Sequence, residues 1–186
     1  MRRKNAQAFL IIPARKAVGL TSVALGLVRT LQRLGIEAGF VKPIAEETPD
    51  RSGYFARQIF QMQVPEALLL QATAERIAAN QTSELLEEIV GLCMKAGEAA
   101  DVLIIEGLHA DESHSFISQI NVDIARSLNA EVIVVADASL ESAFADLRLA
   151  IGQFLNSGCK VAGVVFNKAA EDFDGADAQR RLGRTR

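Results

Sequence analysis

The stretch FLIIPARKAVGLTS, residues 9–22, places a short apolar run directly before a loop and a helix. Its first four residues have the apolar character of a buried strand, and the run stops at Pro13. From Thr21 to Leu34 apolar side chains recur every three or four residues, and Gly35 ends this helical pattern. The chain therefore opens with a strand, a loop and a helix.

The same order of elements recurs along the chain. Short apolar runs separated by helical segments are typical of parallel strands covered on both faces, so we predict a three-layer α/β fold with a mostly parallel central sheet flanked by helices. Pro and Gly interrupt the stretch from Glu46 to Gln81, which we predict to be short helices and loop. A capping-box pattern opens a helix at Ser83. The predicted strands are Phe9–Ile12, Ala38–Lys42, Val102–Glu106, Glu131–Ala136 and Val161–Asn167, and the later helices are Ser83–Lys95, Gln119–Leu128 and Leu140–Leu155.

The length and composition predict one globular domain. A chain of 186 residues with 49% hydrophobic residues can bury a sizeable core. After Lys168 the sequence becomes polar, first acidic and then basic. We therefore predict a domain over residues 1–168 and a polar tail or linker, frayed at its end, over residues 169–186. The abrupt stop predicts a fragment of a longer protein.

Charge and hydropathy exclude several classes of partner. The net charge of -3, without a cluster of basic residues, predicts no binding of nucleic acid. No apolar stretch reaches the roughly 18 to 20 residues of a membrane span, and the basic start with its short apolar run is no signal peptide. Cys93 and Cys159 are typical of reduced thiols. We predict a cytoplasmic protein without a membrane partner.

The loop after the first strand aligns with the phosphate-binding motif G-x-x-x-x-G-K-[ST]. In that motif backbone N–H groups and a helix N-terminus cradle phosphate, while the lysine reaches its outer oxygens. Gly19 and Thr21 match the motif, and the Thr21 hydroxyl has the position that faces a magnesium ion. Ala14 replaces the first glycine and Leu20 replaces the lysine. Half of the binding chemistry is therefore missing.

Two interpretations of this loop remain open. In one, a degenerate nucleotide site takes a substitute cation from Arg15 or Lys16. In the other, the loop is only a turn between strand and helix, with Thr21 or Ser22 near the start of the helix, where Ser and Thr are common.

Polar residues end several predicted strands, and parallel strands deliver such residues to one edge of the sheet. Lys42, Glu106, Asp137 and Asn167 are therefore expected to gather there. Lys42 either meets an anion or keeps its amine in solvent, and Asn167 is either a binding residue or a strand end facing water.

The loop HADESH, residues 109–114, contains both histidines, but the sequence fixes no third partner for them, so we predict no catalytic role.

From Pro13 to Ala45 the chain resembles the opening of bacterial phosphate acetyltransferases of the long, multidomain type, which also carry VGLTS. The related dethiobiotin synthetases have VGKT at this place and a later Lys-Pro pair, matched here by Lys42-Pro43. Further matches follow in order over nearly the whole chain: TPDRS around Asp50, SELLEEIV from Ser83, VLIIEGL from Val102, NVDIARSLNAEVIVV from Asn121 and GVVFNK from Gly163.

The resemblance implies a P-loop NTPase-like fold of the dethiobiotin-synthetase type. It implies that this chain is a regulatory and assembly domain without an active site, in a homo-oligomer. It also implies a C-terminal transferase domain on the same polypeptide, which converts acetyl-CoA and phosphate to acetyl phosphate and coenzyme A. Thr21, Asp50 and Glu106 match the magnesium ligands of dethiobiotin synthetases, and Asn167-Lys168 resembles their adenine-reading element. Magnesium and a nucleotide are the candidate cofactors, and neither is required. The nucleotide-site residues are Arg15, Lys16, Gly19, Thr21, Ser22, Lys42 and Asn167.

Two alternatives accompany this interpretation. One is an ATP- and magnesium-dependent enzyme like dethiobiotin synthetase, against which Leu20 argues. The other is a sensor that binds a nucleotide or dinucleotide without hydrolysing it.

Overall fold

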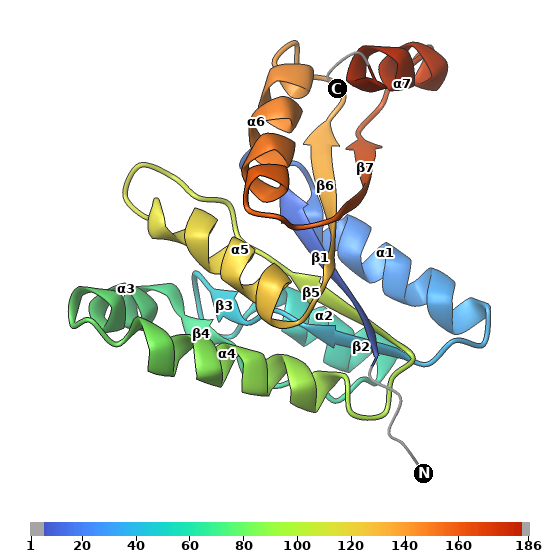
Figure 1. The fold of residues 1–186 in the computed structure, drawn as a ribbon. Coiled ribbons are helices and arrows are strands. Elements are labelled where there is room, and N and C mark those ends of the chain that lie inside the picture. The colour runs from blue at the N-terminus through green and yellow to red at the C-terminus, as the bar shows by residue number, and fades with distance from the viewer. Residues whose placement is uncertain (1–5, 184–186) are drawn as a thin grey trace.

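A computed structural model describes residues 6–183 and confirms the predicted three-layer α/β fold. Five parallel strands form the central sheet in the order β2-β5-β1-β6-β7, and helices cover both faces (Figure 1). Within residues 6–183 no helix is both long and apolar enough to cross a membrane. The strands are β1 (Gln7–Pro13), β2 (Ala38–Val41), β5 (Val102–Glu106), β6 (Glu131–Asp137) and β7 (Val161–Asn167), and the helices are α1 (Leu20–Arg33), α2 (Arg51–Phe60), α3 (Leu70–Ala78), α4 (Thr82–Ala96), α5 (Phe116–Ser127), α6 (Ala143–Asn156) and α7 (Gly175–Gly183).

Two hydrophobic clusters hold the layers together. On one face of the sheet α4, α5 and α6 contribute buried side chains such as Ile89, Ile124 and Phe154. On the other face α1 and α2 contribute side chains such as Val28 and Ala56. Because the inner strands are covered on both faces, their sequences are continuous apolar runs rather than alternating ones.

The predicted end of the first helix is confirmed in detail. Gly35 has a φ of 73°, in the left-handed region, and its N–H donates to the carbonyl of Gln32 at 3.0 Å. The N–H of Ile36 donates to the carbonyl of Leu31 at 3.0 Å, which completes a Schellman motif. The chain then turns back into β2.

Several predicted helix starts are wrong by one to three residues. Helix α4 begins at Thr82, and Gln81 occupies the N-cap position without a side-chain cap bond, so the predicted capping box at Ser83 does not form. The short connection from α3, with Asn80 at a φ of 59°, sets this cap position. Helix α6 begins at Ala143 rather than Leu140, because a turn held by the Asp137 side chain comes first. Helices α1 and α5 begin at Leu20 and Phe116.

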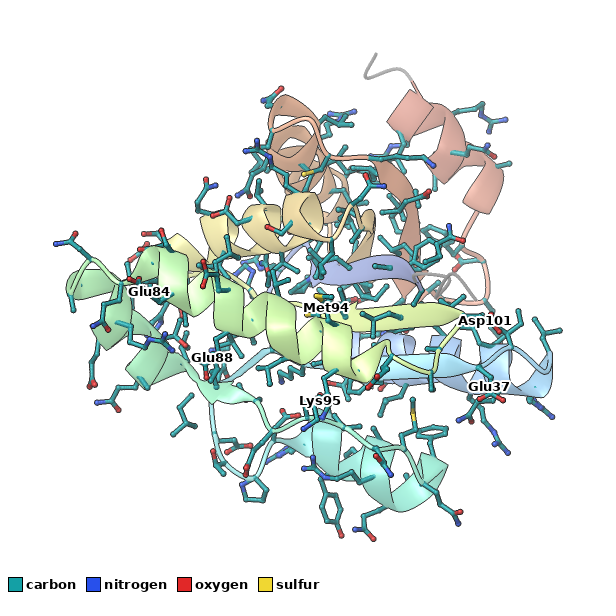
Figure 2. The ribbon with its side chains drawn as sticks, turned by 60° about the horizontal axis from the view of Figure 1, so that its bottom comes forward. Glu37, Glu84, Glu88, Met94, Lys95 and Asp101 are labelled. Carbon is teal, nitrogen blue, oxygen red and sulfur yellow. The ribbon has the colours of Figure 1, made fainter. Side chains whose placement is uncertain are left out.

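The stretch from Glu46 to Gln81 contains the two short helices α2 and α3, as predicted, and part of a second sheet that was not predicted. Strands β3 (Ile44–Ala45) and β4 (Leu68–Leu69) pair in parallel. Strands of two residues leave no recognisable alternation in a sequence. Helix α4 follows α3 and runs past β2, with Met94 and Lys95 on its outer side (Figure 2).

The segment after residue 168 contains helix α7, which lies beside α6 (Figure 1). The Arg181 guanidinium lies 3.7 Å from the centre of the Phe144 ring, and the rings of Phe166 and Phe173 are 5.1 Å apart between centroids. Ala178 is buried. The division of the chain at residue 168 stays a prediction.

We predict that Leu10→Ala lowers the free energy of unfolding by about 2 to 5 kcal/mol, because Leu10 is fully buried in the central strand and its truncation leaves a cavity. Urea unfolding followed by circular dichroism measures this change. The matched control, Leu149→Ala, removes a side chain that is 76% exposed and should change the free energy by less than about 0.5 kcal/mol. Equal effects of the two substitutions would contradict the assigned core.

Candidate functional site

The loop between β1 and α1 leads from the end of a central strand to the N-terminus of a helix. The N–H of Ala14 pairs with the carbonyl of Val135 on β6 at 2.8 Å, which continues the sheet into the loop. Ala17 and Gly19 both have positive φ angles, 62° and 81°. Gly19 is the N-cap of α1 and supplies no side-chain cap, so the first N–H groups of this helix are left without a capping side chain.

The residue at the lysine position of the motif belongs to the hydrophobic core. Leu20 is partly buried and packs against the cluster between the sheet and α1 and α2. Its neighbour Val18, which precedes Gly19, is almost completely buried in the same cluster. This position therefore contributes packing to the fold and no positive charge to the loop.

Asn167, at the end of β7, holds the loop from the other side. Its Nδ2 donates to the carbonyl of Val18 at 2.8 Å. The approach is so close that a Cβ at Gly19 would lie 2.3 Å from this nitrogen. Glycine is therefore required at position 19 both by its positive φ and by the contact with Asn167. The expectation that the Asn167 side chain simply faces water is wrong.

Lys168 continues this hold on the loop. Its Nζ donates to the carbonyl of Ala17 at 2.8 Å and to Oδ2 of Asp137 at 2.7 Å. Asp137 also accepts hydrogen bonds from the backbone N–H and the hydroxyl of Ser139, at 3.0 and 2.6 Å. The hydrogen bond from the Lys168 ammonium has the largest effect on the pKa of Asp137, and the one from Ser139 the next largest. Together they lower this pKa to about 2. We call Asn167, Lys168 and Asp137 the loop clamp.

A second polar cluster lies where α1, α2 and β5 meet. The Thr21 hydroxyl donates to Oε1 of Glu106 at 3.0 Å, and the Ser52 hydroxyl donates to the same oxygen at 2.8 Å. The two hydroxyl oxygens are 2.9 Å apart. Ser52 and Glu106 are both buried. Sequence reasoning missed Ser52, because a serine in the first turn of a helix is common and carries no separate signal.

Lys42 lies between two carboxylates in this cluster. Its Nζ is 3.0 Å from Oδ1 of Asp50 and 3.5 Å from Oε1 of Glu106. The other oxygen of Asp50 accepts the N–H of Gly53 at 2.6 Å and caps α2. Only 15% of the Lys42 side chain is exposed, so the expectation of an amine in solvent is wrong.

Burial and charge oppose each other in this cluster. Burial lowers the pKa of Lys42, but Glu106 and Asp50 outweigh it, and the net pKa is raised. Burial also raises the pKa of Glu106 against the opposing effects of Lys42, Ser52 and Thr21. Oε2 of Glu106 is buried and has no hydrogen-bond partner among the described residues. One hard oxygen is thus left free beside Thr21.

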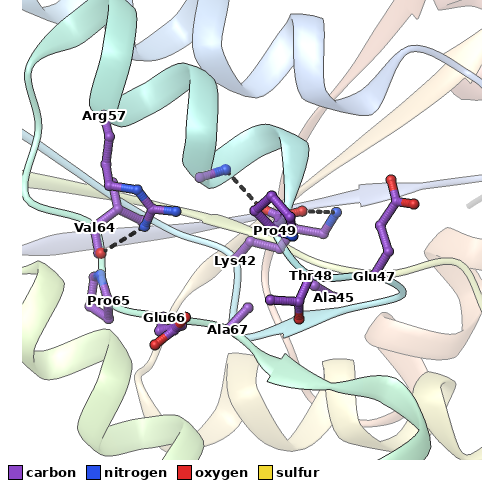
Figure 3. Close-up of a pocket in the computed structure, with 12 residues that line it drawn as sticks. Lys42, Ala45, Glu47, Thr48, Pro49, Arg57, Val64, Pro65, Glu66 and Ala67 are labelled. Atoms are coloured by element: carbon purple, nitrogen blue, oxygen red, sulfur yellow. Dashed lines mark hydrogen bonds and ion pairs between the residues drawn. The ribbon is translucent and has the colours of Figure 1, made fainter.

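The cavity beside Lys42 is small. It is lined by Lys42, Thr48, Pro49 and Arg57, among others, and its volume is about 30 Å³ (Figure 3). The Arg57 guanidinium closes one side by donating to the carbonyl of Val64 at 3.2 Å. A space of this size holds about one water molecule rather than a nucleotide.

Arg15, one of the two candidate substitute cations, does not lie over the loop. Arg15 reaches α6 instead, where it donates to the Ser142 hydroxyl at 3.1 Å and lies 3.6 Å from Asp146. Lys16 and Ser22 are exposed. Of the predicted site residues, Gly19 and Asn167 meet at the loop, whereas Thr21, Lys42, Asp50 and Glu106 meet in the buried cluster.

Neither histidine belongs to the loop clamp or to the Lys42 cluster, but His109 shares a cavity with Pro13, Ala14 and Arg15 at the β1–α1 loop. His109 lines a cavity of about 500 Å³ between α5 and α6, and burial lowers its pKa. His114 binds the Asp111 carboxylate, through its N–H at 2.8 Å and its Nδ1 at 3.0 Å. Across residues 6–183, no three or more His, Cys, Asp or Glu side chains gather as a metal site would require.

Sequence comparison places the chain among known proteins. A family profile described as "AAA domain" matches residues 7–185. A phosphate acetyltransferase of Pseudomonas putida is 37% identical over 95% of the chain, and one of Pseudomonas aeruginosa is 36% identical over 92%. The chain corresponds to the N-terminal part of these relatives and spans about a quarter of their length, 27% and 26%.

Solved structures with low sequence identity share the fold. A putative plasmid partition protein of Borrelia burgdorferi, bound to AMPPNP, superimposes with a TM-score of 0.66 at 12% identity, over 98% of this chain and 84% of that chain. A GTPase of Pyrococcus abyssi in apo form gives a TM-score of 0.56 at 14% identity, over 94% and 71%. These neighbours show that the fold is P-loop NTPase-like.

We predict that Asp137→Asn lowers the stability of the protein in a pH-dependent way. The depressed pKa of Asp137 means that its ionised form stabilises the folded state above about pH 4 and that this contribution is lost as the pH falls toward about 2. The difference in urea midpoint between wild type and variant should therefore be full at neutral pH and shrink below about pH 4. The control Glu131→Gln removes the exposed pair with Lys160 and should shift the midpoint little. A pH-independent difference for Asp137→Asn would contradict the role given to Lys168.

Proposed function

Because the chain belongs to the AAA domain family, we propose that it is the N-terminal domain of a phosphate acetyltransferase, with a regulatory and assembly role and without catalysis of its own. The reaction of the whole protein, acetyl-CoA and phosphate to acetyl phosphate and coenzyme A, would take place elsewhere on the polypeptide. The relatives with this name are about four times as long as the chain, which leaves room for a separate transferase domain. A cytoplasmic homo-oligomer is part of the same proposal.

The observation that carries this proposal is the packing of Leu20. A phosphate-binding loop of this type uses a lysine ammonium at that position to meet the outer phosphates. Here the side chain is apolar and packs into the core, while Arg15 is engaged by α6. The loop lacks a positive charge at the lysine position of the motif, from which it would hold and activate a terminal phosphate. This supports a degenerate pocket rather than an ATPase.

The buried cluster supports the same view. The single charge of Lys42 pairs with both Asp50 and Glu106 and offsets part of the repulsion between the two carboxylates. The donor set still suits magnesium, because Oε2 of Glu106 is a free hard oxygen beside the Thr21 hydroxyl. Thr21, Asp50 and Glu106 are the residues that would hold the ion, and a bound ion would add positive charge beside the loop.

A catalytic alternative draws support from the same cluster. An ATP- and magnesium-dependent enzyme like dethiobiotin synthetase would need a threonine, a lysine and two carboxylates close together. This cluster brings together Thr21, Lys42, Asp50 and Glu106 from four different parts of the chain. A nucleotide or dinucleotide sensor is the third possibility, favoured by the N-terminus of α1, whose N–H groups lack a capping side chain. Binding measurements separate the three.

We predict that the wild-type chain gives no binding heat with Mg·ATP at micromolar concentration and that Leu20→Lys binds at least about tenfold more tightly, since a charge-assisted contact to phosphate contributes at least about 1.4 kcal/mol. Isothermal titration calorimetry measures both. The control Leu20→Met keeps an apolar side chain of similar size and should behave as wild type.

Three outcomes would separate the interpretations. Micromolar binding and hydrolysis by the wild type would favour the dethiobiotin-synthetase-like enzyme. Binding without hydrolysis, seen as a raised melting temperature with ATP, ADP, NADH or coenzyme A, would favour the sensor. Equal affinities of Leu20→Lys and Leu20→Met would contradict the importance given to this position.

We also predict that the purified chain forms no acetyl-CoA from acetyl phosphate and no acetyl phosphate from acetyl-CoA. The reason is that, in this proposal, the transferase chemistry belongs to a separate domain of the longer polypeptide. A thiol-release assay with acetyl-CoA and phosphate measures this activity directly. Turnover above a boiled-protein control would place the active site within this domain and overturn the proposal.

A further inference from the structure

A cavity beside the first half of the β1–α1 loop contains two residues that neither the loop clamp nor the Lys42 cluster uses, Arg15 and His109. It lies between the loop, α5 and α6, and Asp146 of α6 also lines it. We call it the Arg15 cavity. Its volume of about 500 Å³ is typical of small-molecule sites, which measure roughly 300 to 1,000 Å³. It lies at the carboxyl ends of β1 and β5, where α/β sheets bind ligands.

Among residues 6–183, the Arg15 cavity is lined by one cation and one carboxylate, apart from the His109 ring. Nη1 of Arg15 lies 3.6 Å from Oδ2 of Asp146. The Ser142 hydroxyl bridges the same two atoms, since it accepts from Nη1 at 3.1 Å and donates to Oδ2 at 2.9 Å. The pair therefore uses one nitrogen of the guanidinium and one oxygen of the carboxylate.

The remaining polar atoms of this pair are available to a ligand. Nε and Nη2 of Arg15, and Oδ1 of Asp146, have no hydrogen-bond or ion-pair partner within residues 6–183. The side chain of Arg15 is 55% exposed and that of Asp146 is 21% exposed, so both can be reached. A guanidinium can bind both oxygens of a carboxylate, and a carboxylate oxygen accepts from an ammonium. The cavity thus offers one positive and one negative binding group side by side.

The rest of the wall is largely apolar and carries no further charge at neutral pH. Ile12 and Phe154 are buried, whereas Leu149 is exposed. Burial lowers the pKa of His109, and the nearby Arg15 guanidinium also lowers it, so this ring is neutral at pH 7. The wall therefore favours a ligand with an apolar body beside its charged groups.

We propose that the Arg15 cavity binds a free amino acid with an apolar side chain. The carboxylate of the amino acid binds Nε and Nη2 of Arg15, its ammonium binds Oδ1 of Asp146, and its side chain packs against the apolar wall. A zwitterion has the same net charge of zero as the Arg15–Asp146 pair, whereas a phosphorylated ligand would bring several negative charges beside Asp146. A residue within a polypeptide has neither charged group, so it cannot satisfy the pair.

This inference goes beyond the proposed function and rests on it only for a regulatory consequence. Arg15 directly follows Ala14, whose N–H pairs with the carbonyl of Val135. Two residues after Arg15, the carbonyl of Ala17 is held by Lys168 of the loop clamp. An amino acid bound to Arg15 therefore acts on the same loop that the clamp holds.

The test is a titration of the chain with L-leucine, followed by NMR through the ring protons of its two histidines. The resonance of His109 should shift saturably, whereas that of His114, which does not line the cavity and binds Asp111, should stay in place. The variant His114→Gln assigns the two resonances. L-Leucinamide lacks the carboxylate and N-acetyl-L-leucine lacks the ammonium, so each should bind at least about tenfold more weakly than L-leucine.

Variants of the pair identify which group binds which charge. Arg15→Gln should weaken L-leucine binding at least about tenfold and remove most of the difference between L-leucine and L-leucinamide. Asp146→Asn should do the same for L-leucine and N-acetyl-L-leucine. The control Arg29→Gln removes an exposed arginine of α1 and should leave the affinity unchanged. Since a partly exposed ion pair contributes little stability, both variants should fold, and their melting curves by circular dichroism check this.

Several outcomes would overturn the site or its ligand class. Parallel shifts of both histidines, no saturation at millimolar L-leucine, or equal effects of Arg15→Gln and Arg29→Gln would overturn the site. Equal affinities for L-leucine and N-acetyl-L-leucinamide, which resembles a residue within a polypeptide, would show that the cavity takes a chain segment instead. The proposed function fails in a different measurement, because turnover in the thiol-release assay would contradict it and leave this site standing.

Discussion

The Lys42 ammonium, held between Asp50 and Glu106, is the interaction on which the candidate site depends. Two carboxylates this deeply buried repel each other and are costly to remove from water, and one ammonium beside both offsets that cost. The three groups come from the end of β2, the cap of α2 and the end of β5. Thr21 and Ser52 extend the contacts to α1 and to the first turn of α2. The ion pair therefore fixes the carboxyl ends of two strands against two helices.

The other half of the site is organised from β7. Asn167 and Lys168 hold two successive carbonyls of the loop, and Asp137 at the end of β6 anchors Lys168. On the α2 side, Thr21 at the start of α1 binds the Glu106 carboxylate and lies beside the Ser52 hydroxyl. On the β7 side, the Asn167 amide and the Lys168 ammonium bind the loop carbonyls. Both sets of groups lie at the carboxyl ends of the strands, where a doubly wound sheet presents its crevice. The conformation of the loop therefore depends on the positions of the ends of β6 and β7.

Most of the fold could be predicted from the sequence because burial on both faces leaves continuous apolar runs. The limits of β5 and β7 were predicted to the residue, and Gly35 ended the first helix through its left-handed φ. Cap positions were less predictable: Gln81 became an N-cap through the shape of the connection before it, not through its own chemistry. Strands β3 and β4 are too short to leave a pattern.

The candidate site was predicted as a set of residues but not as a set of contacts. That Lys42, Glu106 and Asn167 lie at one edge follows from the parallel sheet. That Asn167 bonds Val18, 149 residues earlier in the chain, depends on how far β7 stands from the loop, which no local pattern encodes. The same holds for Ser52, whose partner Glu106 is 54 residues away. The sequence thus predicts which residues belong to the candidate site, whereas the tertiary packing determines their hydrogen-bond partners.

The contacts of Gly19 change how the remnant of the motif should be interpreted. A glycine beside a helix start is usually taken as a mark of phosphate binding, since it lets backbone N–H groups approach an anion. Here the same glycine is required by a φ of 81° and by the Asn167 amide, which occupies the space of its missing Cβ. Leu20 is partly buried and packs against the core beside it. Val18, Gly19 and Leu20 of VGLTS thus have roles in packing and in the contact with the loop clamp, and Thr21 binds Glu106, so this motif does not by itself establish nucleotide binding.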